Sequence, residues 1–203
     1  MKTKMLTKID NIQMYNDMIN LEKDLLQKFE ENKTYQEFAN ENPTHVINPL
    51  VNEPHPSTWE CTSRIINLFY LYNIFNEDYI TLNELENEII NLFKETYPER
   101  AGEKFYLSGW LVTLREGDVL GDHFHMLKDG ESWYGYYCVN TTGSATIFES
   151  GDVDAVNGML TLFQTDGQVH SVSTWNNPDS VRITIGYHIF KTPIADYAKE
   201  FTV

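Results

Sequence analysis

The sequence has only two cysteines and no long apolar run. Cys61 and Cys138 are too few and too far apart for a disulfide framework, and neither has a nearby cysteine or histidine that would complete a zinc site. The most apolar stretch, residues 65–75, is interrupted by Asn67 and Asn73 and is too short to span a bilayer. The first ten residues are basic but lack the apolar run of a signal peptide. We therefore expect a reduced, cytoplasmic protein.

Positive charge is also scarce. Lysine and arginine together number 15, against 30 aspartates and glutamates, which gives a formal net charge of −15. A field of this sign repels phosphate backbones and anionic membranes, so we expect neither nucleic acid nor a membrane as a partner. A small molecule or another protein is the expected substrate, and the oligomeric state is not predicted.

The length and the composition are those of a single globular domain. A chain of 203 residues with a 41% hydrophobic share can bury roughly 70% of its unfolded surface around one core. No internal repeat divides the chain. We expect residues 1–203 to form one domain, with a mostly helical extension over residues 1–98 and a β core over residues 105–190.

Helical spacing dominates the first hundred residues. The apolar residues Met18, Leu21, Leu25 and Phe29 recur at intervals that place them on one face of an amphipathic helix. Four prolines between residues 42 and 56 favour an extended connector. A second helical region is predicted at about 62–76. A third helix is predicted from the capping-box pattern Thr81-Leu82-Asn83-Glu84 up to Pro98.

Short β-type runs rich in Val, Thr, Tyr and Phe follow, separated by turn signals such as Asn157-Gly158 and Asp166-Gly167. Seven or eight antiparallel strands of this kind form a jelly roll or a barrel, with the helices packed outside one sheet. The predicted strands lie near 105–115, 120–126, 133–140, 144–149, 158–164, 168–174 and 181–190.

Three histidines have the residue type and spacing of metal ligands. His123 and His125 are two residues apart, so on a strand both imidazoles face the same side, and His170 can join them through folding. A lone histidine in a β protein is more often a satisfied core or surface residue. The pair followed by a distant third favours a site for divalent iron with open coordination positions. Asp122 faces the other way on a regular strand and is not an expected ligand.

Arg182 follows His170 by twelve residues, and Thr184 shares its face of the strand. A guanidinium that faces a barrel interior needs an anion, and a carboxylate matches its planar fork. A salt bridge with one of the many acidic residues is the alternative. His188 has the same parity as Arg182 but lies too far along the strand to be an expected metal ligand.

The stretch from about Trp110 to Phe190 resembles the 2-oxoglutarate and Fe(II)-dependent oxygenases, in particular their His-x-His group. The residues that carry the resemblance are Trp110, Gly117-Asp118, His123-Phe124-His125, the run Tyr134 to Asn140, the run Gly158 to Phe163, His170-Ser171-Val172, and Arg182 to Ile185.

The resemblance implies a double-stranded β-helix and an oxygenase that uses Fe(II) and 2-oxoglutarate. His123 and His170 would be metal ligands, and Arg182 would bind the far carboxylate of 2-oxoglutarate with help from the Thr184 hydroxyl. Tyr134 and Tyr136 share strand parity and would either add a hydroxyl to the cosubstrate site or line the barrel.

One departure from the wider superfamily concerns His125. That position usually holds Asp or Glu, and three neutral imidazoles leave the metal with its full double charge. Two alternatives therefore stay open: a cupin-like three-histidine metalloenzyme without a cosubstrate, and a non-catalytic jelly-roll binding module. Trp133 and Trp175 are predicted near the mouth of the barrel, and residues 126–131 are predicted to act as a lid.

Overall fold

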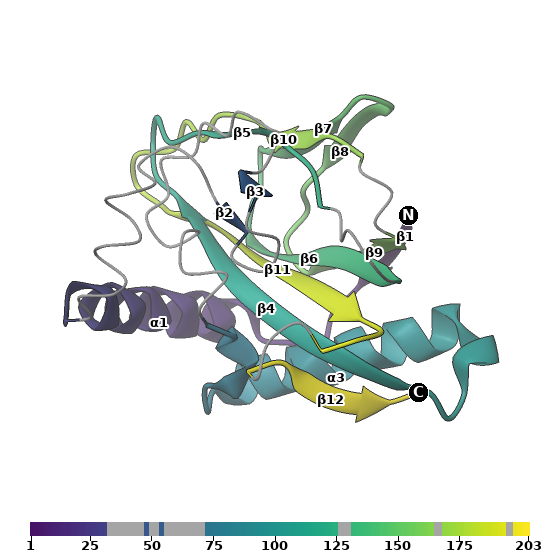
Figure 1. Ribbon diagram of the computed structural model, residues 1–203. Coiled ribbons are helices and arrows are strands. Elements are labelled where there is room, and N and C mark those ends of the chain that lie inside the picture. The colour runs from purple at the N-terminus through teal and green to yellow at the C-terminus, as the bar shows by residue number, and fades with distance from the viewer. Residues whose placement is uncertain (32–46, 49–52, 55–71, 126–130, 165–167, 194–196) are drawn as a thin grey trace.

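The computed structural model describes residues 1–31, 47–48, 53–54, 72–125, 131–164, 168–193 and 197–203. Two antiparallel sheets face each other, and two long helices lie against the outer face of the larger sheet (Figure 1). Within these ranges no helix is long and apolar enough to cross a membrane.

The strands form two main sheets and one small pair, and every pairing is antiparallel. The larger sheet contains, in order, β1 (Lys2–Met5), β9 (Met159–Gln164), β6 (Ser132–Asn140), β11 (Arg182–Phe190), β4 (Lys104–Leu114) and β12 (Lys199–Thr202). The smaller sheet contains β5 (Leu120–His123), β10 (His170–Val172), β7 (Ala145–Phe148) and β8 (Gly151–Asp154). The short β2 (Ile47–Asn48) pairs with β3 (Glu53–Pro54).

The order of the strands identifies the fold. From β4 to β11 the chain passes back and forth between the sheets, so that β9-β6-β11-β4 faces β5-β10-β7-β8 across one interior. Eight strands wound in this way form a jelly roll, or double-stranded β-helix. The predicted fold class is therefore confirmed, and β1 and β12 extend the larger sheet at its two edges.

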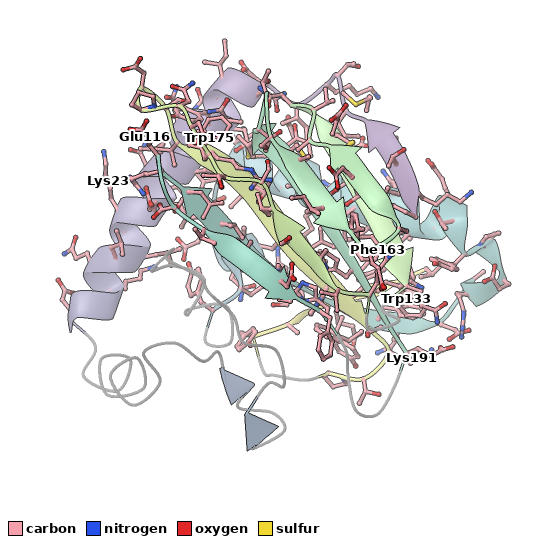
Figure 2. All side chains as sticks on the ribbon, turned by 90° about the horizontal axis from the view of Figure 1, so that it is seen from above. Lys23, Glu116, Trp133, Phe163, Trp175 and Lys191 are labelled. Carbon is pink, nitrogen blue, oxygen red and sulfur yellow. The ribbon has the colours of Figure 1, made fainter. Side chains whose placement is uncertain are left out.

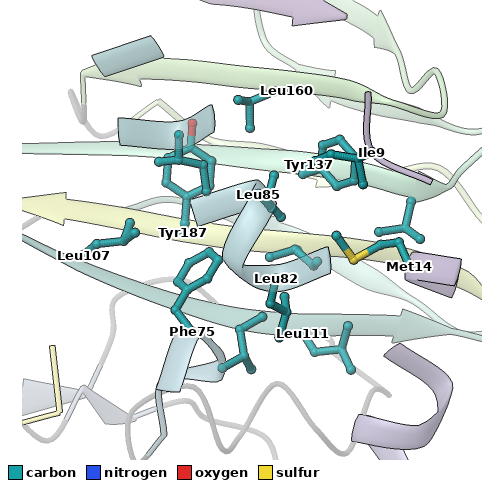
Figure 3. Close-up of a cluster of buried hydrophobic side chains, with 14 of the residues drawn as sticks. Ile9, Met14, Phe75, Leu82, Leu85, Leu107, Leu111, Tyr137, Leu160 and Tyr187 are labelled. Atoms are coloured by element: carbon teal, nitrogen blue, oxygen red, sulfur yellow. The ribbon is translucent and has the colours of Figure 1, made fainter. Parts of the chain in front are cut away.

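The helices α1 (Asn11–Glu31) and α3 (Ile80–Thr96) and the short 3₁₀ turns η2 (Ile74–Asn76) and η3 (Pro98–Arg100) complete the described elements. Side chains on one face of the larger sheet pack against the helices. Figure 3 shows Tyr187 of the sheet near Leu82 and Leu85 of α3. Because side chains alternate along a strand, the other face of β4, β6 and β11 points to the space between the sheets.

Two predictions about local structure need correction, and a third is only partly covered by the described residues. The helix α3 begins at Ile80 without a side-chain cap, and the Thr81 hydroxyl donates instead to Asp17 Oδ2 of α1 at 2.6 Å, so the capping box is wrong. The strands β1, β8 and β12 were not expected, because they are short, carry charged residues and lie at sheet edges. Of the second helical region, predicted at about 62–76, residues 62–71 lie outside the described residues, and the described remainder contains the short 3₁₀ turn η2.

A close approach in the larger sheet depends on Gly135. The Tyr187 ring crosses this residue so that its hydroxyl donates to the Thr161 carbonyl. A Cβ atom at position 135 would lie 2.1 Å from that carbonyl oxygen and 2.3 Å from Tyr187 Cζ. The Tyr187 side chain is fully buried and cannot turn away into solvent. The position therefore accepts glycine alone without a shift of β9 or Tyr187.

We expect Gly135→Ala to lower the free energy of unfolding by about 2–3 kcal/mol, because the added methyl group overpacks a closed core. Urea unfolding followed by circular dichroism measures the change. A loss below about 0.5 kcal/mol, the usual range of neutral surface substitutions, would contradict the packing described for Tyr187.

The single-domain organisation over residues 1–203 remains a prediction, and the packing suggests how to test it. The main core cluster combines Met14 of α1 and Leu85 of α3 with Leu107 of β4 and Ile185 of β11. A fragment of residues 1–98 would expose the apolar faces of both helices. We expect this fragment to be degraded rapidly by trypsin, whereas the full chain resists. A stable, cooperatively folding fragment would show that the helical part is a separate domain.

Candidate functional site

Two of the predicted metal ligands lie opposite each other in the smaller sheet. His123 ends β5 and His170 begins β10, and these two residues are direct partners in the ladder. Both side chains are about 3% exposed, and their ring centroids are 4.2 Å apart. Pairing of the two strands therefore brings together residues that are far apart in the sequence.

Hydrogen bonds fix the orientation of both imidazoles. His123 Nδ1 lies 2.8 Å from the Gly121 carbonyl oxygen, and His170 Nδ1 lies 3.2 Å from that of Gln168. A carbonyl only accepts hydrogen bonds, so each Nδ1 carries the proton and each Nε2 keeps its lone pair. Burial lowers the pKa of His170, which favours the neutral form that a metal ligand requires.

His125 completes a group of three. One ring nitrogen from each of His123, His125 and His170 lies within 4.8 Å of the other two, an arrangement that can hold one metal ion. His170 Nε2 is buried and has no hydrogen-bond partner among the described residues, so its lone pair is available to coordinate a metal ion. The donor set of three imidazoles fits a divalent transition metal.

The three histidines line a cavity between the sheets, and Arg182 lies on the wall of this cavity. Arg182 is buried, with about 1% of its surface exposed. Its Nε donates to Ser144 Oγ at 2.9 Å and its Nη1 to Thr184 Oγ1 at 3.4 Å. In the described part of the chain no carboxylate pairs with it, so the salt-bridge alternative has no support there. Burial lowers the pKa of Arg182 to about 10, and the guanidinium stays charged at neutral pH.

The cavity contains all the residues that the sequence suggested for the cosubstrate. Thr184, Tyr134 and Tyr136 line it together with Arg182 and the three histidines. Burial raises the pKa of Tyr136 to about 12 and that of Tyr134 still further, so both phenols stay protonated. Both tyrosines can therefore donate hydrogen bonds but do not supply negative charge.

Trp110 and Gly186 form a part of the wall whose role the sequence did not reveal. They are direct partners across β4 and β11, and a Cβ atom at Gly186 would lie 2.4 Å from Trp110 Cε2. The indole therefore lies flat over the glycine and lines the cavity. His188, outside the three-histidine group as expected, packs edge-on against Trp110 at 5.0 Å between centroids. Burial, and to a smaller extent the proximity of His170, lowers the pKa of His188 to about 3.

Ser144 was also missed by sequence reasoning. It follows Gly143, whose φ of 90° closes the turn before β7, and its hydroxyl accepts the hydrogen bond from Arg182. A serine in a turn has no periodic signal, so only the folded chain shows that it reaches a strand 38 residues away.

The prediction that both tryptophans flank the mouth of the barrel is wrong for Trp133. This side chain is buried on the helix side of the larger sheet, where its ring meets Phe93 edge-on at 5.0 Å. Trp133 and Trp175 lie at opposite ends of the sheets in Figure 2. Trp175 is buried too, and its indole N–H donates to the Ser180 carbonyl at 2.9 Å.

Two other predictions concern residues beside His123 and His125. Asp122 is exposed and faces away from the cavity, as its parity with His123 predicted. Of the suggested lid over residues 126–131, residues 126–130 lie outside the described residues. The suggestion therefore stays a prediction.

No family model and no curated protein matches the sequence. Solved structures with a similar fold include a viral collagen prolyl hydroxylase from Paramecium bursaria chlorella virus 1, at 8% identity and a TM-score of 0.45, covering 57% of this chain and 71% of that chain. A Pseudomonas putida prolyl-4-hydroxylase matches at 14% identity and a TM-score of 0.42, covering 58% and 69%. A cupin domain from Bordetella pertussis matches at 18% and 0.31, covering 41% and 81%. Because these TM-scores are below 0.5, the fold is identified by the strand order.

The three-histidine group predicts how many metal ions each chain binds. We expect the wild-type protein to retain one divalent metal per chain after dialysis, and His123→Ala and His170→Ala to lose stoichiometric binding, because two imidazoles hold a labile ion weakly. Metal analysis of the dialysed proteins measures the stoichiometry. His188→Phe keeps a ring at a nearby position outside the group and should retain the metal. One metal per chain in both alanine variants would disprove the site.

Proposed function

We propose that the protein is a non-haem iron oxygenase that couples oxidative decarboxylation of 2-oxoglutarate to hydroxylation of a second substrate. His123, His125 and His170 would hold Fe(II), and Arg182 with Thr184 would bind the far carboxylate of 2-oxoglutarate. Bound iron would supply the site for dioxygen activation. The overall reaction converts 2-oxoglutarate, dioxygen and R–H into succinate, carbon dioxide and R–OH.

The observation that carries this proposal is the buried guanidinium of Arg182 beside the histidines. Burying a charge without an opposite charge is costly, and two hydroxyls compensate a guanidinium only in part. A carboxylate offers two acceptor oxygens in the plane of the guanidinium fork. A dicarboxylate that reaches both the metal position and Arg182 would satisfy both ends of the cavity.

The residues around Arg182 would orient that carboxylate. Ser144 accepts from Nε and Thr184 from Nη1, which fixes the plane of the guanidinium before a ligand enters. The protonated Tyr136 hydroxyl lines the same cavity and would donate a further hydrogen bond to the cosubstrate. The apolar walls, such as Val112 and Leu120, keep water away from these polar contacts.

A cupin-like metalloenzyme that binds its substrate directly to the metal is the second candidate. The observation that favours it is the third imidazole, because His125 stands where a carboxylate would give the more usual oxygenase ligand set. Arg182 favours the first candidate, because an enzyme that binds its substrate only through the metal does not need a second, distant cation. The substrate in either case would be a small molecule or a protein, and the net charge of −15 favours the approach of a neutral or cationic one to the surface.

Arg182 separates the two candidates. We expect Arg182→Ala to weaken 2-oxoglutarate binding by about thirtyfold or more, because removing one partner of a buried charge-assisted pair costs roughly 2–5 kcal/mol. Arg182→Lys should recover only part of the affinity, since an ammonium lacks the bidentate fork. Metal affinity should change little. Anaerobic calorimetry with a redox-inert divalent metal measures both constants.

Arg100→Ala is the matched control, because Arg100 is partly exposed, pairs with Glu131 and lies outside the cavity. Its 2-oxoglutarate affinity should equal that of the wild type. Equal affinity in the wild type and in a folded Arg182→Ala variant would remove the main support for the cosubstrate and favour the cupin-like candidate.

A further inference from the structure

The three candidate ligands are not held in the same way. His123 and His170 belong to paired strands and face each other in the ladder, so the backbone hydrogen bonds of the smaller sheet position both of them. The strand β5 ends at His123. His125 lies two residues beyond that end and is half-buried, so the ladder that positions the first two ligands does not extend to it.

Among the ring contacts that His125 makes with other described residues, the shortest is with Tyr134. The centroids of the two rings are 3.9 Å apart and their planes differ by only 16°, so the rings stack face to face. The contacts of His125 with His123 and His188 are nearly perpendicular, at 87° and 84° and at longer centroid distances. Parallel stacking at van der Waals distance restricts rotation of the imidazole about its Cβ–Cγ bond.

Tyr134 is itself firmly placed. It belongs to the long strand β6, where its neighbours across the ladders are His188 and Phe163. Its ring is buried and also meets Trp110 at 5.8 Å and 27° and Phe163 at 4.8 Å and 73°. The larger sheet thus presents a fixed aromatic surface to a ligand that comes from the end of the smaller sheet.

We propose that Tyr134 is a positioning residue that acts through the face of its ring: it fixes the plane of His125 so that this imidazole completes the metal site with His123 and His170. This inference rests on the proposed metal site. It assigns Tyr134 a role that does not involve its hydroxyl, and it leaves the hydrogen bond to the cosubstrate to Tyr136. The third ligand is then set by packing between the two sheets and the first two by strand pairing.

The experiment uses the full-length protein loaded with Co(II) in the absence of 2-oxoglutarate. Paramagnetic cobalt shifts the ring protons of every bound imidazole far outside the normal proton spectrum, so the sets of shifted imidazole resonances count the bound histidines. We expect three sets in the wild type and in Tyr134→Phe, which keeps the ring and lacks the hydroxyl. We expect two sets in Tyr134→Leu, with a cobalt dissociation constant about tenfold to a hundredfold higher.

Tyr136→Leu is the matched control. Tyr136 lies two residues along the same face of β6 and lines the same cavity, and within the described residues no ring contact joins it to His125. It should keep three sets of resonances. Tyr134→Met tests the same point with a flexible apolar side chain if the leucine variant does not fold, and circular dichroism monitors folding in each case.

The outcomes distinguish this inference from the proposed function. Three sets of resonances in a folded Tyr134→Leu or Tyr134→Met variant would overturn the positioning role and leave the metal site intact. Two sets in Tyr134→Phe would show that the hydroxyl is needed, which also overturns it. A wild-type protein that binds no cobalt, or that shows only two sets, would refute the three-histidine metal site itself.

Discussion

The site depends on one constraint, which is that both faces of the larger sheet are buried. The helices cover one face of the larger sheet and the smaller sheet covers the other, so all nine residues of β11 are buried. Strand alternation then separates Ile183, Ile185 and Tyr187, which pack beneath the helices, from the residues between them. A polar side chain on the inner face has no access to bulk water and must be satisfied by neighbours or by a ligand.

The charge inside the barrel differs from the charge outside. The protein carries a formal net charge of −15, but the described residues that line the cavity include Arg182 and no carboxylate. A divalent ion held by three neutral imidazoles would add two further positive charges in the same enclosed space. A dianion compensates these charges far better than a neutral ligand does. Net charge therefore describes how the surface meets partners and does not predict what the cavity binds.

Much of the fold and of the proposed site could be read from periodicity. The two-residue spacing in His-x-His and in Arg182-x-Thr184 placed each pair on one side of a strand, and the turn signals separated the strands between them. Periodicity does not say which side is the inner one, and for this reason Trp133 was expected at the mouth although its neighbour Tyr134 lines the cavity. Ser144 and Gly186 act through partners distant in sequence, and a single sequence contains no signal for such contacts.

The three histidines of the proposed site are positioned in two different ways, and this difference follows from the topology of the fold. The paired strands β5 and β10 of the smaller sheet align His123 and His170 by their register. A third donor at the end of β5 leaves the ladder, so its orientation depends on the sheet opposite. A carboxylate at that position would need only a correctly placed oxygen, whereas an imidazole must also have the correct ring plane. With His125 as the third donor of the proposed site, a flat aromatic neighbour such as Tyr134 would therefore define part of the geometry of that site.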